Sequence, residues 1–130
     1  MNRKWFGIIT LVALATSLLL SSSCARDQKL TSISIQPSGG FTFEGLNAAG
    51  QFTAYGTYIH PPQTKDITSL VTWTINVQNL ATITPGGLIT YTRTDLCGSG
   101  DVTATYNFDG SVYTASAPVK GALDGTASCQ

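Results

Sequence analysis

Residues 71–90 read VTWTINVQNLATITPGGLIT, and the alternation at the start of this stretch decides the fold. Positions 71, 73, 75 and 77 are apolar, whereas the positions between them hold Thr, Asn or Gln. A pleated strand places these two sets on opposite faces, so we expect a half-buried strand with Trp73 on its core face. A helix would need apolar residues three and four positions apart, and it disfavours the β-branched side chains that fill most of residues 71–75.

Two further short strands are predicted within the same stretch. Residues 80–84 and 88–92 flank Pro85, Gly86 and Gly87, which predict a tight connection. Alternating runs between turn residues predict more strands, at 30–36, 51–58, 100–107 and 111–119, with a short ladder at 41–43. Residues 59–65 hold two successive prolines and are expected to form a loop. Short strands with close turns are typical of an all-β sandwich.

Several pieces of the chain follow one another in a recognisable order. They are Trp73-Thr74, Asn79-Leu80-Ala81-Thr82-Ile83, Gly87-Leu88-Ile89-Thr90 and Gly100-Asp101-Val102-Thr103-Ala104-Thr105. This order resembles the bacterial immunoglobulin-like domain, group 2, of surface proteins such as the intimin and invasin adhesins. With the upstream pieces 33–37, 51–58 and 65–68, the resemblance covers residues 30–119.

The resemblance implies an immunoglobulin-like β-sandwich of about seven antiparallel strands. It also implies a binding, adhesion or structural role at the bacterial surface. Two departures concern detail. Ile75 stands where a polar residue is usual, and residues 94–98 bring Cys97 into a loop that normally has no cysteine.

The first residues resemble a lipoprotein leader. Arg3 and Lys4 precede an uncharged run, residues 5–20, that is too short to span a bilayer as a helix, and small residues 21–23 lead to Cys24. This predicts a signal peptide at 1–23, a lipidated Cys24 and short tether at 24–29, a domain at 30–121 and a tail at 122–130. Leu20 lies one position further from the cysteine than is usual. The alternative is cleavage after Ala25, which releases a soluble protein.

Length and charge exclude several function classes. The 130 residues fit one domain. Seven basic and seven acidic residues balance, but removing Arg3 and Lys4 with the leader leaves 7 − 2 = 5 basic residues against 7 acidic ones. Nucleic acids and anionic lipids are therefore not expected partners, because both require clustered Lys or Arg.

Cysteine parity predicts one disulfide. The chain has three cysteines, and either cleavage accounts for Cys24. Cys97 and Cys129 remain, and thiols are usually oxidised outside the cytoplasm, so we expect these two to form a bridge that ties the tail back. A metal site is the weaker alternative because the only histidine is His60. Burial of Cys97 and Cys129 as free thiols is expected less than the bridge, since neither cysteine lies in an apolar alternating run.

No catalytic pattern stands out, and we predict no enzyme activity, no cofactor and no metal. His60 precedes two prolines in a predicted loop, and Glu44 is the only glutamate. The loop aspartates lie beside turn residues, where carboxylates usually accept local backbone hydrogen bonds; they are Asp66, Asp95, Asp101, Asp109 and Asp124. No serine lies in a Gly-x-Ser-x-Gly motif.

Tyrosines supply the one surface hint. Tyr55 and Tyr58 are candidates for stacking on a glycan or protein partner, although Tyr also simply favours strands. The sequence therefore predicts an exported, envelope-anchored lipoprotein of the outer membrane, with one non-catalytic immunoglobulin-like module and a glycan or protein ligand in the envelope. The alternatives are a secreted soluble module and a small carbohydrate-active enzyme that uses loop aspartates.

Overall fold

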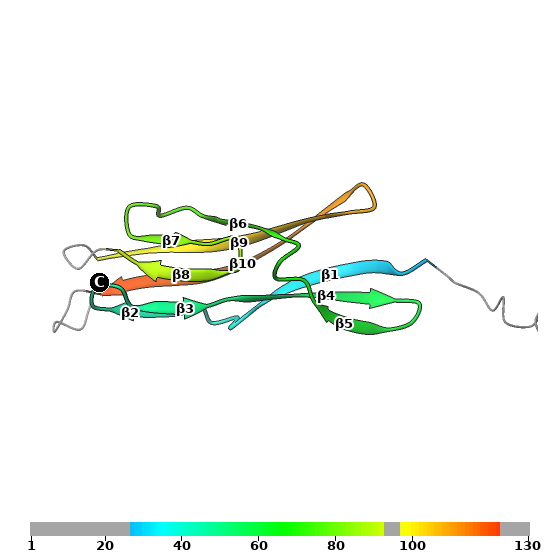
Figure 1. Cartoon of the computed structure of the whole chain (residues 1–130), viewed down its shortest axis with the longest axis horizontal. Helices are drawn as coiled ribbons and strands as arrows, with labels where there is room; N and C mark the ends of the chain where they lie inside the picture. Colours follow the sequence, from blue (N-terminus) through cyan, green and yellow to red (C-terminus); the bar gives the residue numbers. More distant parts are fainter. Residues whose placement is uncertain (1–26, 93–96, 123–130) are drawn as a thin grey trace, which may run out of the picture.

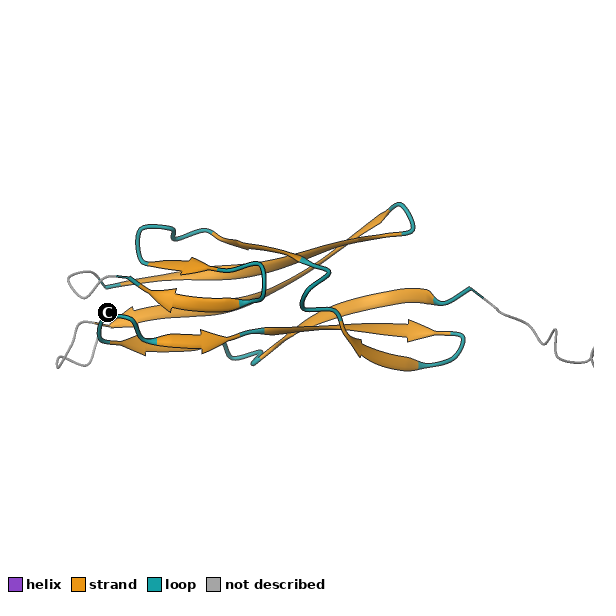
Figure 2. Ribbon diagram, in the orientation of Figure 1, coloured by secondary structure: helices purple, strands orange, loops and turns teal. Residues whose placement is uncertain are grey.

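The computed structural model describes residues 27–92 and 97–122, and these residues form an all-β structure (Figures 1 and 2). Ten strands and no helix lie in this part of the chain. The strands are β1 (Lys29–Gln36), β2 (Phe41–Glu44), β3 (Ala49–Gln51), β4 (Thr53–Ile59), β5 (Gln63–Asp66), β6 (Thr72–Ile75), β7 (Ala81–Ile83), β8 (Leu88–Tyr91), β9 (Gly98–Phe108) and β10 (Ser111–Ala122). The all-β prediction is confirmed, whereas the predicted number of about seven strands is too low.

The strands form three sheets. Their orders are β1-β4-β5, β2-β10-β9-β6 and β3-β8-β7. Every pairing is antiparallel except β2 with β10, which is parallel. The prediction that all strands are antiparallel is therefore wrong at this one pair. The turn at residues 37–40 carries the chain from β1 in the first sheet to the edge strand β2 of the second, where β2 lies parallel to β10.

Gly40 permits this crossing. Its φ is +70°, and a Cβ at this position would overlap the backbone carbonyl of Pro118 in β10. Both the backbone angle and the close approach require glycine. The Gly40 N–H also donates to the Pro37 carbonyl oxygen at 3.0 Å, which closes the turn.

The predicted strand at 51–58 is two strands, because β3 pairs with β8 and β4 pairs with β1, and the chain changes its partner at Phe52. The Phe52 N–H donates to the Gly87 carbonyl oxygen at 2.9 Å, while its fully buried ring lies edge-on to Phe41 and stacks on Trp73. The predicted loop at 59–65 is also partly wrong. Its prolines occupy only the turn, and β5 pairs with β4 through polar residues that show no apolar alternation.

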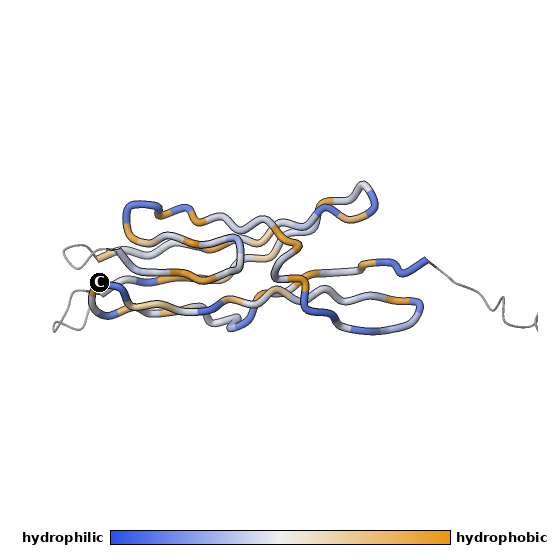
Figure 3. The backbone as a smooth tube through the Cα atoms, viewed as in Figure 1, coloured by the Kyte–Doolittle hydropathy of each residue, from blue (hydrophilic) through white to orange (hydrophobic). Residues whose placement is uncertain are grey.

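One hydrophobic core lies between the sheets. It draws on strands of all three, including Ile35 of β1, Ile89 of β8 and Val102 of β9. Hydrophilic residues gather in the β4–β5 hairpin, the β6–β7 connection and the turn between β9 and β10 (Figure 3). That last turn holds Asp109 and Gly110, both with positive φ, as the Asp-Gly sequence predicts.

Candidate binding groove

Trp73 lies in β6 with its ring in the core. It is 8% exposed, and its ring stacks on Phe52 with 6.2 Å between ring centroids. Its indole Nε1–H donates to the Thr68 carbonyl oxygen at 3.1 Å. Burial of a large ring with its polar group bonded is favourable, so Trp73 anchors the start of β6 to the segment before it.

The turn before β6 is built by Asp66 and Thr68. The Thr68 N–H donates to Asp66 Oδ1 at 2.9 Å, and Thr68 Oγ1 accepts from the Ala54 N–H at 3.0 Å. Hydrogen bonds from the Thr68 hydroxyl and backbone hold the pKa of Asp66 below its ordinary value. Asp66 is therefore an ionised turn residue at neutral pH, which fits the predicted local role and not that of a proton donor.

An open groove of about 400 Å³ runs between β6 and β7. It is lined from β6 by Trp73, Thr74 and Ile75, and from β7 by Ala81, Thr82 and Ile83. Each of these strands is the edge strand of its sheet. The lining carries no charged side chain, so the groove suits a neutral ligand. The sequence analysis did not find this groove, although residues 67–92 form a run without Asp, Glu, Lys or Arg.

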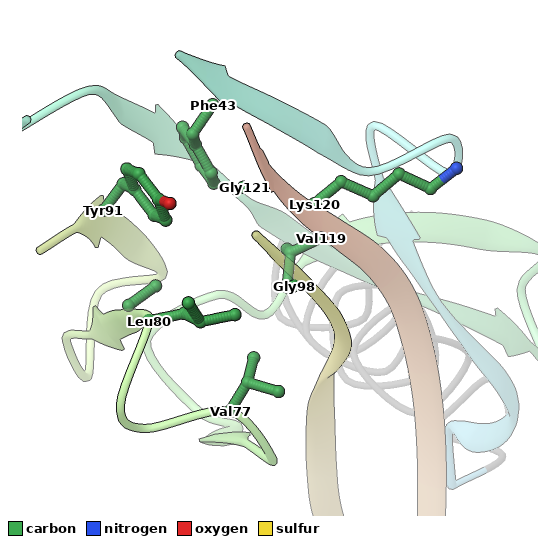
Figure 4. Close-up of a pocket in the computed structure, with 9 residues that line it drawn as sticks. Phe43, Val77, Leu80, Tyr91, Gly98, Val119, Lys120 and Gly121 are labelled. Atoms are coloured by element: carbon green, nitrogen blue, oxygen red, sulfur yellow. The ribbon is translucent and has the colours of Figure 1, made fainter. Parts of the chain in front are cut away.

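A second cavity, of about 10 Å³, lies near the end of β10 (Figure 4). Leu80 and Tyr91 line it, whereas the side chain of Lys120 extends away. A Cβ at Gly98 would overlap Leu80, and a Cβ at Gly121 would overlap Tyr91. A space this small holds one water molecule at most, and an apolar lining keeps it dry. It is a packing gap between tightly approaching strands.

The two candidate tyrosines do not form one surface. Residues of opposite parity on β4 point to opposite faces, so Tyr55 and Tyr58 cannot stack on the same ligand. Tyr58 is 4% exposed and offers no accessible ring face, which corrects its prediction as a surface aromatic. Tyr55 is half-buried and keeps part of its surface accessible.

Tyr58 belongs instead to a small aromatic cluster. Its ring lies edge-on to Phe108 at 5.7 Å between centroids, and Phe108 contacts Tyr106 at 5.9 Å. Lys65 Nζ lies 5.1 Å from the centroid of the Tyr58 ring, a distance at which a cation is attracted to the ring. Nearby, the Tyr113 hydroxyl donates to the Leu30 carbonyl oxygen at 2.9 Å. The β9–β10 hairpin is thus joined to β1 and β4.

We expect alkaline pH to weaken this cluster. Burial raises the pKa of Tyr58 above its ordinary value of 10.0, and its hydrogen bond with Tyr106 adds to the shift. The resulting stabilisation is complete below about pH 10 and is lost as pH rises through the folded-state pKa. Tyr58→Phe should flatten this alkaline loss in urea unfolding, while Tyr55→Phe keeps it. If Tyr58→Phe loses stability at alkaline pH as the wild type does, Tyr58 is not the group that causes the loss.

The other predicted site residues lie apart or outside the description. His60 and Asp109 are exposed turn residues, and Asp101 is exposed on β9. In residues 27–92 and 97–122, no three His, Cys, Asp or Glu residues gather to hold a metal ion. Cys97 directly precedes β9, whereas Cys24 and Cys129 lie outside the described residues, as do Asp95 and Asp124. The anchor and the disulfide therefore stay predictions.

Compared with known proteins, the chain matches no family model and no curated protein sequence. The described residues contain no apolar helix of membrane-spanning length.

Proposed function

We propose that this protein is a bacterial envelope lipoprotein whose single immunoglobulin-like domain is a non-catalytic binding module. The groove of about 400 Å³ between β6 and β7 carries the proposal, because it is large, open and lined by uncharged side chains. A few apolar and hydroxyl groups around a preformed depression are typical of a binding site. The ligand is a protein or a glycan of the envelope.

The order of strand pairing supports an immunoglobulin-like sandwich. Such a sandwich has strands A, B, E and D in one sheet and C, F and G in the other. If β3 and β4 together are strand B, then the pairs β1–β4, β3–β8 and β8–β7 follow the order A-B-E-D. The pairs β6–β9 and β9–β10 follow the order C-F-G. β2 is then an additional piece of the first strand and β5 an additional edge strand.

The short tether supports a position close to the membrane. β1 begins at Lys29, so the chain between Cys24 and the first sheet reaches at most about 17 Å when extended. A lipidated Cys24 would hold the β1 end of the domain near the bilayer. Tyr58 pairs with Leu30 near the start of β1 and so lies toward that end, while β6 and β7 extend toward the opposite end (Figure 1).

Cys24→Ser tests the anchor. We expect the wild-type chain in the membrane fraction and the variant in the soluble fraction, because only the cysteine thiol accepts the lipid. Immunoblotting of separated fractions measures the distribution, and Cys97→Ser is the matched control that should stay with the membrane. Equal membrane association of wild type and Cys24→Ser would refute lipid anchoring, and a soluble wild type would indicate the secreted form.

A binding screen with peptidoglycan fragments and glycans, paired with a turnover assay, tests the non-catalytic role. Saturable binding without loss of the probe supports a binding module. Turnover that disappears in Asp101→Asn would overturn it, because Asp101 is an exposed carboxylate available to act on a sugar.

A further inference from the structure

The backbone of β6 presents hydrogen-bonding groups to the groove. The Asn76 N–H donates to the Asp101 carbonyl oxygen at 3.2 Å, next to the antiparallel pairing of β6 with β9. Hydrogen-bonded and non-hydrogen-bonded residue pairs alternate along such a ladder, so this bond shows which residues of β6 bond to β9. By this alternation, Thr72 and Thr74 exchange hydrogen bonds with β9. The N–H and C=O groups of Trp73 and Ile75 therefore point away from β9, along the open edge.

The facing edge of β7 has fewer such groups. The Thr84 N–H donates to the Leu88 carbonyl oxygen at 2.9 Å, so Thr82 and Thr84 face β8, and the backbone groups of Ala81 and Ile83 face outward. One of these is already used, since the Ala81 N–H donates to the Val77 carbonyl oxygen at 3.3 Å. β6 is therefore the better template for a new strand.

Neither edge carries the usual protection. Edge strands of soluble proteins are commonly covered by other elements or protected by charged residues or proline. Here β6 and β7 lie in the uncharged run of residues 67–92, and neither strand contains proline. No described strand pairs with the outer edge of either one.

We propose that the groove binds an extended, uncharged peptide segment of another protein, which adds to the sheet as a strand beside β6. The outward groups of Trp73 and Ile75 supply two donors and two acceptors at the two-residue spacing that a strand requires. A charged segment would lose hydration against a lining that offers no opposite charge, so the partner strand is neutral.

A second copy of this chain fits the groove less well. The β6 strand of a second copy belongs to a sheet that packs against another sheet, so both layers of the copy would have to approach the groove. A single peptide strand can lie between β6 and β7 without a second layer. The inference rests on the proposed binding role but not on the lipid anchor. A failed Cys24→Ser test would leave the groove experiment unaffected.

Hydrogen exchange of single backbone amides tests the proposal. The sample is the full chain in detergent micelles, and the probe is a capped seven-residue peptide of alternating threonine and valine. With the peptide at about ten times its Kd, exchange at the Trp73 and Ile75 amides should slow about tenfold. The Thr72 and Thr74 amides are the internal control, because they already bond to β9 and should not change.

Two controls make the result specific. The same peptide with N-methyl groups on alternate amides should lose the effect, because it cannot donate to β6. Gln78→Lys, which places a charge at the groove, should weaken binding at least tenfold, while Gln36→Lys outside it should not. No slowing, or equal slowing by the N-methylated peptide, would overturn the proposal. Slowing that grows with protein concentration in the absence of peptide would overturn it in favour of self-pairing.

Discussion

Trp73→Ala is expected to lower the free energy of unfolding by about 3–5 kcal/mol. For a domain of this size, that loss is a large part of the total stability and can unfold a large fraction of the molecules. The substitution removes a ring that is 8% exposed and stacks on Phe52, and it leaves a cavity beneath β6. It also removes the Nε1–H that donates to the Thr68 carbonyl oxygen, so the turn before β6 loses its attachment to Trp73. Both losses act at the same strand.

Urea unfolding followed by circular dichroism measures this effect. Val112→Ala is the matched control, because Val112 is 65% exposed and should change stability by less than about 0.5 kcal/mol. Trp73→Phe separates the two causes, since it keeps most of the ring area and removes the donor. A Trp73→Ala protein as stable as the wild type would show that the ring does not support the core.

Removing the Cys97–Cys129 bridge is expected to cost about 3–4 kcal/mol. The predicted bridge would close a loop of 129 − 97 + 1 = 33 residues, and closing such a loop lowers the entropy of the unfolded chain, which corresponds to about this free energy. The double variant Cys97→Ser, Cys129→Ser should therefore keep its strands and melt at a lower temperature. The core strands supply the fold without the bridge, because their apolar faces pack together between the sheets.

Intact mass after alkylation decides whether the bridge exists. The protein isolated without reductant should take up no alkylating agent at these two cysteines until it is reduced. Alkylation of both without reductant would rule the bridge out, as would a covalent dimer that separates on reduction.

Period-two alternation predicted the strands that bury one face. The apolar set around Trp73 and the alternate residues of β4 lie in the core, because side-chain parity follows directly from the pleat. The same reasoning missed β5, whose residues are half-buried or exposed, since a polar strand leaves no alternating signal. It also missed the break at Phe52, where the chain changes its partner from β8 to β1, because the choice of partner strand depends on residues far along the chain.

The candidate site was harder to predict than the fold. Tyr58 was a surface candidate because its ring could stack on a ligand, whereas its ring is buried and contacts Phe108 and Lys65 from other strands. The groove arises where two sheet edges meet, and strand order is not encoded in any local pattern. The uncharged run over residues 67–92 was the one available signal, and it indicates unprotected edges only after the topology is known.

The pairing of β1 with β4 determines how the domain would respond to mechanical tension. With the proposed lipid anchor at Cys24, a pull on the anchor would enter at Lys29 and run along β1, whose ladder to β4 extends from Lys29 to Gln36. Force along paired strands loads their hydrogen bonds in shear, so the bonds share the force and do not open one at a time. The Tyr113 hydroxyl adds a cross-link to Leu30 near the point of entry. A partner held in the groove and drawn away from the membrane would therefore be resisted by the whole strand.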